Sequence, residues 1–327
     1  MYKIIAIGDV VLDTHVKIDE ASVECDIDGK RCKLCFDYAA KVPVTDSFQT
    51  VGGNAANLAF GTAKLGLQTT IISTVGNDSN GKIIKDELTK SKINIDLIYS
   101  DNREKTRYSI VLNFKGERTI LSYHKKRNYQ WPKEIPATDW IYFTSLSEGF
   151  EPLQKKMMSF LDKHPSVRLA YNPGSFQLKN NLELSREIAA HCDLLILNLE
   201  EAELVAGINY KKTKAITGLI HKLLQIGAKE VIITDAARGA WAGNIDEIWH
   251  HDSFDVPIIS KTGAGDSFAA GYLSAKIYNH NIPICLSWGI ANSCAVIGHF
   301  GVQNGLLDKN GINKMIKQFP KILPQKL

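Results

Sequence analysis

The stretch that decides the interpretation of this chain is Thr262-Gly263-Ala264-Gly265-Asp266-Ser267-Phe268-Ala269-Ala270-Gly271. Two glycines and an alanine leave backbone N–H groups open where a helical run begins, and a helix N-terminus favours anions through its unpaired N–H groups and its dipole. Asp266 falls in the first helical turn, where a carboxylate can take a proton from an attacking hydroxyl. The stretch therefore suggests phosphoryl transfer to an alcohol.

The composition is that of an ordinary globular protein. With 327 residues, 44% of them hydrophobic and 23% charged, the chain suits a single α/β domain over residues 1–327. The net charge of +4 is too small for this length to indicate nucleic acid or a membrane surface as a partner. Residues 1–9 turn acidic too soon for a signal peptide and are expected to form a buried strand, which favours a cytoplasmic location.

Three of the six cysteines, Cys25, Cys32 and Cys35, lie in one charged segment. Cys32 and Cys35 have the spacing of metal ligands, but no second cysteine or histidine pair follows nearby to complete a structural zinc site. We therefore expect reduced thiols on a peripheral segment, and their role stays open.

Apolar and helical stretches alternate along most of the chain. From Asp139 onward the pattern is steadily βαβ, which indicates a parallel sheet covered by helices. The segments 11–50 and 95–127 instead show a half-buried alternation that suits an antiparallel sheet with one face in water, and Asn113-Phe114-Lys115-Gly116 is a predicted hairpin turn. Joined together, the two segments would form a small projecting β-sheet, a lid beside the catalytic end.

Two common nucleotide-binding motifs are not expected here. Residues 76–82 begin like a Walker A loop, but Ile83 stands where a hydroxyl must hold magnesium, so we expect a strand-to-helix turn. The turn at 263–265 lacks the third glycine of a dinucleotide fingerprint and comes late in the chain, which argues against a nicotinamide cofactor.

The run Gly52-Gly53-Asn54-Ala55-Ala56-Asn57 carries polar side chains suited to a ligand. Asn54 and Asn57 fall one helical turn apart, so both amides share a face and can bind a polyhydroxylated molecule. A capped helix with small residues packed on the sheet explains the run equally well.

Polar side chains also follow two of the predicted strands. Asp13 comes just beyond the first strand, at the edge where ligands of open α/β sheets gather. Asn198 and Glu201 follow the strand at 194–197, where a carboxylate can position hydrated magnesium. Taken alone, the latter pair is more typical of an ordinary helix start.

In this order, these pieces resemble the ribokinase-like (PfkB) family of sugar and nucleoside kinases. The resemblance runs from Gly8 to about Gly301, and its most specific parts are the run at 52–57 and the turn at 262–266. It implies a three-layer α/β/α fold with a mostly parallel central sheet and a small projecting β-sheet lid, to which the segments 11–50 and 95–127 correspond.

The resemblance implies a role for each candidate residue. Asp266 would deprotonate the acceptor hydroxyl, and the backbone amides of Gly263, Ala264 and Gly265 would hold the γ-phosphoryl group of ATP. The remaining implied assignments are Asp13, Gly53, Asn54 and Asn57 for the acceptor's hydroxyls, Asn198 and Glu201 for phosphate and for Mg²⁺ (Glu201 through water), and Thr234, Gly239 and Asn292 for ATP.

The chain departs from the family pattern at two places. Many members carry an acidic residue ahead of the glycine turn, where this chain has Ser260-Lys261-Thr262. Because that acidic residue helps bind a monovalent cation in some members, potassium is doubtful as a cofactor here. Ala236 stands where a glycine is usual, which weakens the detailed ATP assignment.

The expected function is an ATP- and magnesium-dependent kinase that phosphorylates a hydroxymethyl group of a small sugar or sugar-like substrate. A nucleoside kinase is the alternative, since residues 171–174 and the lid aromatics Phe36 and Tyr38 leave room for a base. A non-catalytic sensor of sugars or nucleotides is less expected, because it would not need Asp266.

The nature of the acceptor and the oligomeric state stay open. No cluster of arginines stands near Asn54 or Asp13 in the sequence, so a phosphorylated acceptor is less favoured, although Arg107 or Arg118 could reach in. Exposed lid strands often pair across two copies of a chain, so a homodimer through the lid is conceivable.

Overall fold

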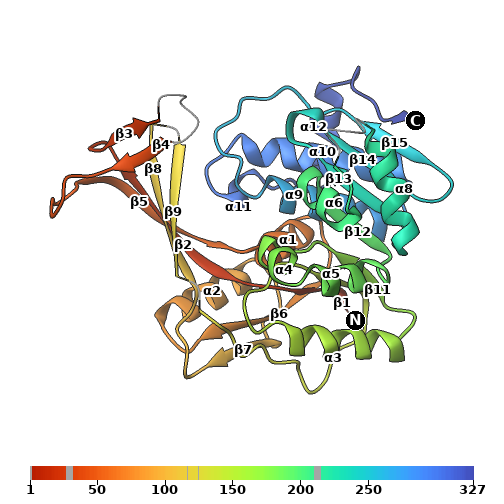
Figure 1. Ribbon diagram of the computed structural model, residues 1–327, viewed down its shortest axis with the longest axis horizontal. Coiled ribbons are helices and arrows are strands. Elements are labelled where there is room, and N and C mark those ends of the chain that lie inside the picture. Colours follow the sequence, from red (N-terminus) through yellow and green to blue (C-terminus); the bar gives the residue numbers. More distant parts are fainter. Residues whose placement is uncertain (1, 27–31, 116, 124, 210–214) are drawn as a thin grey trace.

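The computed structural model describes residues 2–26, 32–115, 117–123, 125–209 and 215–327. These residues form a three-layer α/β/α body with a ten-stranded central sheet, and a separate four-stranded sheet projects from it (Figure 1). The three-layer fold with a small additional sheet is confirmed.

The central sheet is mostly parallel. Its order is β16-β15-β14-β13-β12-β11-β10-β1-β6-β7, with parallel pairing from β13 to β7 and antiparallel pairing from β13 to β16. The strands are β1 (Tyr2–Ile7), β6 (Thr69–Gly76), β7 (Ile98–Asp101), β10 (Thr138–Phe143), β11 (Arg168–Tyr171), β12 (Leu194–Asn198), β13 (Val231–Thr234), β14 (Ala240–Gly243), β15 (Ile248–His251) and β16 (Gln325–Lys326).

Helices cover both faces of this sheet, which is why its inner strands are apolar on both sides. In β1, Ile4 and Ala6 join one hydrophobic cluster while Ile5 and Ile7 join the other. The first cluster includes residues of α1 (Asn54–Lys64), α2 (Ser79–Lys90), α9 (Ala264–Ile277), α10 (Ile282–Ile297), α11 (Val302–Gly305) and α12 (Lys309–Gln318). The second includes residues of α3 (Glu151–Lys163), α4 (Ser175–Asn180), α5 (Leu182–Ala189), α6 (Leu199–Ala206) and α8 (Ile216–Ile226).

The projecting sheet, called the lid below, has the order β5-β2-β8-β9. Its strands are β2 (Val11–Ile18), β5 (Val44–Gly52), β8 (Tyr108–Phe114) and β9 (Glu117–Tyr123). The prediction of an antiparallel lid is only partly correct, because β2 and β8 run parallel. They come from separate excursions out of the central sheet, and no tight turn obliges them to run in opposite directions. The β8–β9 pairing, with Phe114 opposite Glu117, supports the predicted hairpin, although Gly116 of its turn lies outside the described residues.

Of two other predictions for this region, one differs from the structure and one is confirmed. Strand β7, expected in the second lid segment, is the edge strand of the central sheet because it pairs with β6. The run at 76–82 is a strand-to-helix turn as predicted, with the Asp78 side chain accepting the Gly81 N–H at 2.9 Å to cap α2.

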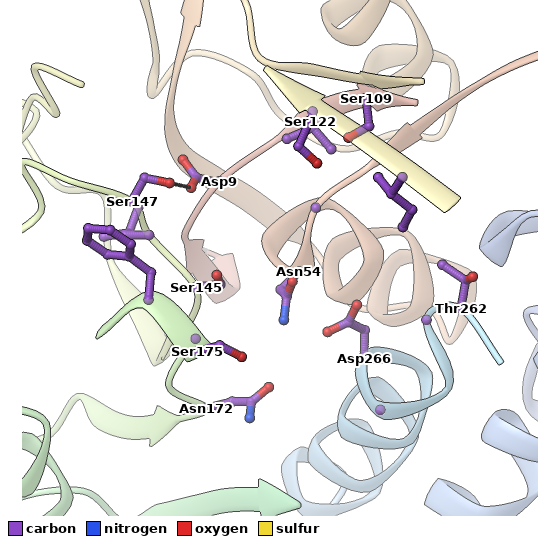
Figure 2. A pocket seen from close by; sticks show the side chains of 18 of the residues that line it. Asp9, Asn54, Ser109, Ser122, Ser145, Ser147, Asn172, Ser175, Thr262 and Asp266 are labelled. Carbon is purple, nitrogen blue, oxygen red and sulfur yellow. Dashed lines mark hydrogen bonds between the residues drawn. The ribbon is translucent and has the colours of Figure 1, made fainter. Parts of the chain in front are cut away.

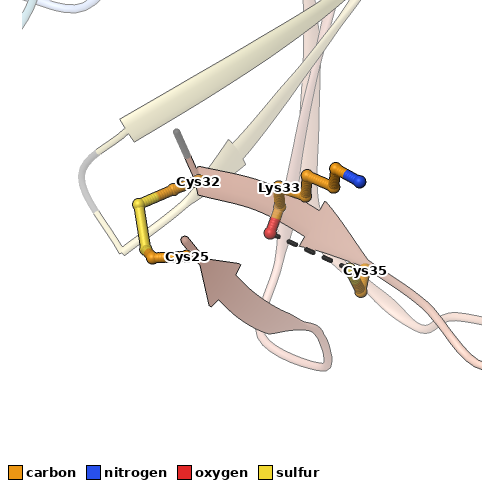
Figure 3. Close-up of a disulfide and its surroundings, with 4 residues drawn as sticks. All are labelled: Cys25, Cys32, Lys33 and Cys35. Carbon is orange, nitrogen blue, oxygen red and sulfur yellow. Dashed lines mark hydrogen bonds between the residues drawn. A yellow bond between two sulfur atoms is a disulfide. The ribbon is translucent and has the colours of Figure 1, made fainter. Parts of the chain in front are cut away.

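The expectation of reduced thiols is wrong for Cys25 and Cys32, which form a disulfide (Figure 3). They face each other across the hairpin of β3 (Ser22–Cys25) and β4 (Cys32–Cys35), with Cα atoms 4.0 Å apart. Sequence spacing draws attention to Cys32 and Cys35 instead, but antiparallel pairing decides which thiols meet.

Within the described ranges, none of the helices has the length and apolar character needed to cross a bilayer.

Candidate active site

The turn before α9 is shaped by two glycines with different tasks. Gly263 has φ +75, and a Cβ there would lie 2.3 Å from a methyl of Val302, so only glycine fits without rearrangement. A Cβ at Gly265 would meet no atom within 4 Å, so this residue exposes its backbone to open space. The first helical turn has amides without intrahelical acceptors, and here they border a cavity.

Asp266 lies at this helix start and is buried. Burial raises the pKa of its carboxyl to about 7, while a hydrogen bond from Asn57 lowers it. The Asn57 Nδ2 donates to Asp266 Oδ2 at 2.8 Å and so joins α1 to α9. A carboxyl that titrates near neutral pH and stands beside an anion site is suited to take a proton from a hydroxyl.

The cavity has a volume of about 890 Å³ and opens between the lid and the carboxyl ends of β1, β12 and β13 (Figure 2). It brings together most of the candidate residues from distant parts of the chain. Those lining it are Asp13, Gly53, Asn54, Asn198, Glu201, Thr234, Gly263, Ala264, Gly265 and Asp266.

Asp13 is held at the base of the lid by close packing. Gly52 leaves room for its carboxylate, since a Cβ there would lie 2.4 Å from Asp13 Oδ2. Burial raises the pKa of Asp13, and a hydrogen bond with Ser109 and the charges of His15 and Arg118 oppose that shift. The result is a fixed carboxylate that can accept hydrogen bonds from ligand hydroxyls.

Asn198 and Glu201 form a capping box at the start of α6, so the ordinary helix start considered for them is present. The Glu201 N–H donates to Asn198 Oδ1 at 2.9 Å, and the Asn198 N–H donates to Glu201 Oε2 at 3.0 Å. Both residues also line the cavity. Burial raises the pKa of Glu201 to about 7, and the Asp266 charge adds to the shift.

Three candidate residues implied by the resemblance, Asn57, Asn292 and Gly239, lie outside the cavity lining. Asn57 is buried behind the cavity lining and binds Asp266 rather than facing an acceptor. Asn292 is fully buried, with its amide donating to Ser267 O at 2.8 Å and accepting from Leu307 N at 3.0 Å, so it joins α10 to its neighbours. A buried polar side chain is usually hydrogen-bonded within the protein, and both polar atoms of the Asn292 amide are engaged in this way.

Gly239 also lies outside the cavity lining and serves a tight turn. It has φ +80, and a Cβ would lie 2.0 Å from His251 O. Ala236 opens the same turn, within the short 3₁₀ helix Ala236–Arg238, with φ +43. A left-handed backbone conformation favours glycine, so alanine is strained at this position.

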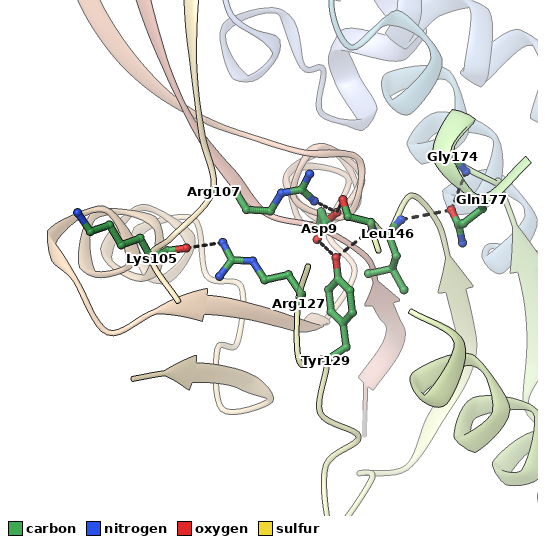
Figure 4. A network of polar contacts seen from close by, with 9 residues as sticks. Asp9, Lys105, Arg107, Arg127, Tyr129, Leu146, Gly174 and Gln177 are labelled. Carbon is green, nitrogen blue, oxygen red and sulfur yellow. Dashed lines mark hydrogen bonds and ion pairs between the residues drawn. The ribbon is translucent and has the colours of Figure 1, made fainter. Parts of the chain in front are cut away.

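Sequence reasoning missed a buried network around Asp9 (Figure 4). The Asp9 carboxylate pairs with the Arg107 guanidinium and accepts hydrogen bonds from Tyr129 Oη at 2.6 Å and Ser147 Oγ at 3.1 Å. The partners come from three separate segments, so no local pattern could have revealed them.

A group of hydroxyls was also missed. Five serines border the cavity: Ser109, Ser122, Ser145, Ser147 and Ser175 (Figure 2). The Asn54 amide points into the same space, whereas the Asn172 amide accepts from Tyr142 Oη at 3.0 Å and donates to Ile196 O at 2.8 Å. Serine is common at surfaces and turns, so only its convergence in space carries meaning.

Basic residues line the cavity as well. Lys261, within the segment 260–262 that departs from the family pattern, borders it beside the glycine turn, and Ser260 Oγ donates to Thr262 Oγ1 at 3.1 Å. The structure also brings Arg107 and Arg118 to the cavity, although they stand far from Asp13 in the sequence.

Comparisons with known proteins agree with this geometry. The model of the pfkB family of carbohydrate kinases matches residues 13–310. An ATP-dependent 6-phosphofructokinase of Thermoanaerobacterium thermosaccharolyticum is 25% identical over 81% of this chain and 84% of its own length. A ribokinase of Staphylococcus aureus is 27% identical over 77% of this chain and 83% of its own length. The crystal structure of a putative E. coli ribokinase II in complex with ATP and Mg²⁺ superposes with a TM-score of 0.78 and 18% identity, covering 97% of this chain and 100% of that one.

Proposed function

This chain belongs to the pfkB family of carbohydrate kinases, and from that premise we propose that it transfers the γ-phosphoryl group of ATP to a hydroxymethyl group of a small sugar or sugar-like acceptor. One observation carries the proposal. Asp266, buried at the start of α9, faces the same cavity as the hydroxyl-binding candidates Asp13 and Asn54. A base, an anion site and an acceptor pocket thus share one space.

The reaction uses few groups of the protein. Asp266 takes the proton of the acceptor hydroxyl while the hydroxyl oxygen attacks the γ-phosphorus of ATP. The bond between the γ-phosphorus and the bridging oxygen breaks, and ADP leaves with that oxygen. The first-turn amides at 263–265 donate to the oxygens of the transferring group, where they stabilise the charge that develops. Lys261, at the edge of the same turn, adds positive charge near the phosphates.

The residues present suit Mg²⁺ bound largely through water and phosphate. Glu201 and Asn198 border the cavity, and within the described ranges no group of three or more acidic, histidine or cysteine side chains gathers to hold a metal directly. Mg²⁺ usually keeps several waters and takes only one or two carboxylates. Glu201 would hold the waters of a bound Mg²⁺, and the ion would supply positive charge to neutralise the phosphates.

A sugar fits the acceptor region better than a nucleoside. The convergent serines and the Asn54 amide offer donors and acceptors for several hydroxyls. The nucleoside alternative rests on Phe176, which borders the cavity and is 37% exposed, so its ring is free to stack on a base.

Formation of ADP across pentoses, hexoses, sugar acids and nucleosides tests this proposal. Saturable turnover with a sugar, lost in Asp266→Asn, is the expected result. Turnover with nucleosides but with no sugar would favour the alternative. Binding of ATP and a sugar without transfer, unchanged in Asp266→Asn, would instead identify a sensor.

We also propose that the lid joins two copies of the chain. Its edge strands β5 and β9 expose apolar side chains, among them Val44, Phe48 and Leu121. An unpaired strand edge with apolar neighbours favours association. Sedimentation of the wild type and of Leu121→Lys should show a dimer that the substitution weakens, and a monomeric wild type would refute the contact.

A further inference from the structure

One face of the lid turns its alternate residues into the cavity. Two rows cross β2, β8 and β9 in register: Asp13, Ser109 and Ser122, then His15, Val111 and Ile120. Arg118 continues this face two residues before Ile120, and Lys125 follows the end of β9. The lid therefore presents hydroxyls and a carboxylate close to the body, with Arg118 beyond them and Lys125 at the body end of β9.

Arg118 and Lys125 bring positive charge to the cavity lining. Asp9 is already engaged by Arg107, whose side chain is only 2% exposed. Neither Arg118 nor Lys125 forms an ion pair within the described ranges, and both are exposed. Arg107 also lines the cavity, and its buried Nε and Nη2 have no hydrogen-bond partner among the described residues.

Asp13 lies close enough to Arg118 for their charges to interact. The Arg118 guanidinium lowers the pKa values of both Asp13 and His15, so it lies within electrostatic range of both. It makes no ion pair with Asp13, whose carboxylate is packed against Gly52 and hydrogen-bonded with Ser109. Arg118 is thus free to bind a ligand.

We propose that the acceptor carries an anionic group, a phosphate ester or a carboxylate, away from the hydroxyl that Asp266 activates, and that Arg118 binds this group while Lys125 adds positive charge. The guanidinium fork matches both kinds of anion and makes stronger hydrogen bonds to them than to neutral oxygens. That the bound anion belongs to a phosphoryl acceptor rests on the proposed kinase function. That Arg118 binds an anionic group in this cavity does not depend on that function.

Matched acceptor pairs test the subsite directly. Each pair keeps a free hydroxymethyl group: fructose against fructose 1-phosphate and fructose 6-phosphate, and glucitol against gluconate. We expect kcat/KM at least about tenfold higher for an acidic member, with a difference that shrinks as ionic strength rises. Preference for the sugar phosphates or for gluconate distinguishes the two anions. Equal turnover of neutral and acidic members would overturn the proposal.

Substitutions then locate the contact. Arg118→Gln should raise KM for the acidic acceptor about tenfold or more with little change in kcat, and leave the neutral partner unaffected. Lys125→Gln should have a smaller effect in the same direction. Lys115→Gln changes an exposed lysine of the same hairpin that does not line the cavity, and should change nothing. If Arg118→Gln impaired both acceptors equally, Arg118 would act only on Asp13 and the proposal would fail.

Binding measured by calorimetry without ATP separates this inference from the kinase proposal. If no acceptor yields ADP, the kinase proposal fails, but tighter binding of the acidic sugars, lost in Arg118→Gln, would still support the subsite. Equal binding of acidic and neutral sugars would overturn it, whatever the outcome of the kinase assay.

Discussion

Replacing Asn57 by alanine should move the pH dependence of catalysis rather than simply reduce it. Asn57 donates to Asp266 at 2.8 Å, and this bond favours the charged carboxylate against the burial that raises its pKa to about 7. Because the base must be ionised to accept a proton, kcat/KM should rise with pH through the pKa of Asp266. Without the amide that pKa increases, and the rising limb of the profile shifts to higher pH.

The size of the shift follows from the strength of the bond. A hydrogen bond to a charged group contributes about 1.5–3 kcal/mol, and about 1.4 kcal/mol corresponds to one pKa unit, so a shift of about 1–2 units is expected. At pH 7 the ionised fraction would fall from about half to roughly 1–10%, and the rate by about 5–50-fold. Above about pH 9 most of the activity should return.

A coupled assay of ADP formation from pH 5.5 to 9.5, with the best acceptor found, measures this effect. Asn54→Ala is the matched control, because Asn54 lies on the same helix and borders the cavity. The side-chain hydrogen bond to Asp266 comes from Asn57 and not from Asn54. The control should raise KM for the acceptor without moving the profile. An unshifted profile for Asn57→Ala, with a uniform loss of rate and an unchanged melting temperature, would refute the proposed role of Asn57.

Three further predictions concern the helix start and its surroundings. Asp266→Asn should lower kcat by on the order of 10²–10⁴-fold. The same substitution should nevertheless raise the melting temperature at pH 8, because a carboxyl whose pKa rises from 3.8 to about 7 on folding costs stability increasingly as pH increases through that window. The gain in melting temperature should be larger at pH 8 than at pH 5, and an equal gain at both pH values would contradict the burial of Asp266. Gly265→Ala should fold normally, because its Cβ enters open space, but should raise KM for ATP. Gly263→Ala should have a lower melting temperature, because this residue has φ +75 and its Cβ would clash with Val302. Equal melting temperatures of the two variants would argue against the described turn. Ala236→Gly should increase the free energy of unfolding by about 1 kcal/mol by relieving a φ of +43, as measured by urea denaturation.

Much of the fold could be predicted because its signals are local. The alternation of apolar runs and helical stretches after Asp139 specifies parallel strands that need cover on both faces. Pairing between distant segments carries no such local signal. The parallel contact of β2 with β8, the place of β7 in the central sheet and the Cys25–Cys32 bridge all depend on it, and each of these differs from what the sequence predicts.

The site divides in the same way. Asp13, Asn54 and the turn at 262–266 could be proposed from short motifs, and the structure places all of them at one cavity. Asn57 and Asn292 belong to equally suggestive patterns but have their amides engaged inside the protein. Whether a polar side chain faces a ligand or a neighbouring helix depends on how helices pack, which residue spacing does not encode.

By itself, the sequence determined the chemistry available at the start of α9: bare amides, a helix dipole and a carboxylate in the first turn, all within a few consecutive residues. Only the tertiary structure decided what surrounds that carboxylate. It buried Asp266, brought an amide from 209 residues away to its side, and turned the hydroxyls and Arg118 of the lid toward the same cavity. Helix geometry follows from adjacent residues, whereas a pocket arises where separate strands and helices meet.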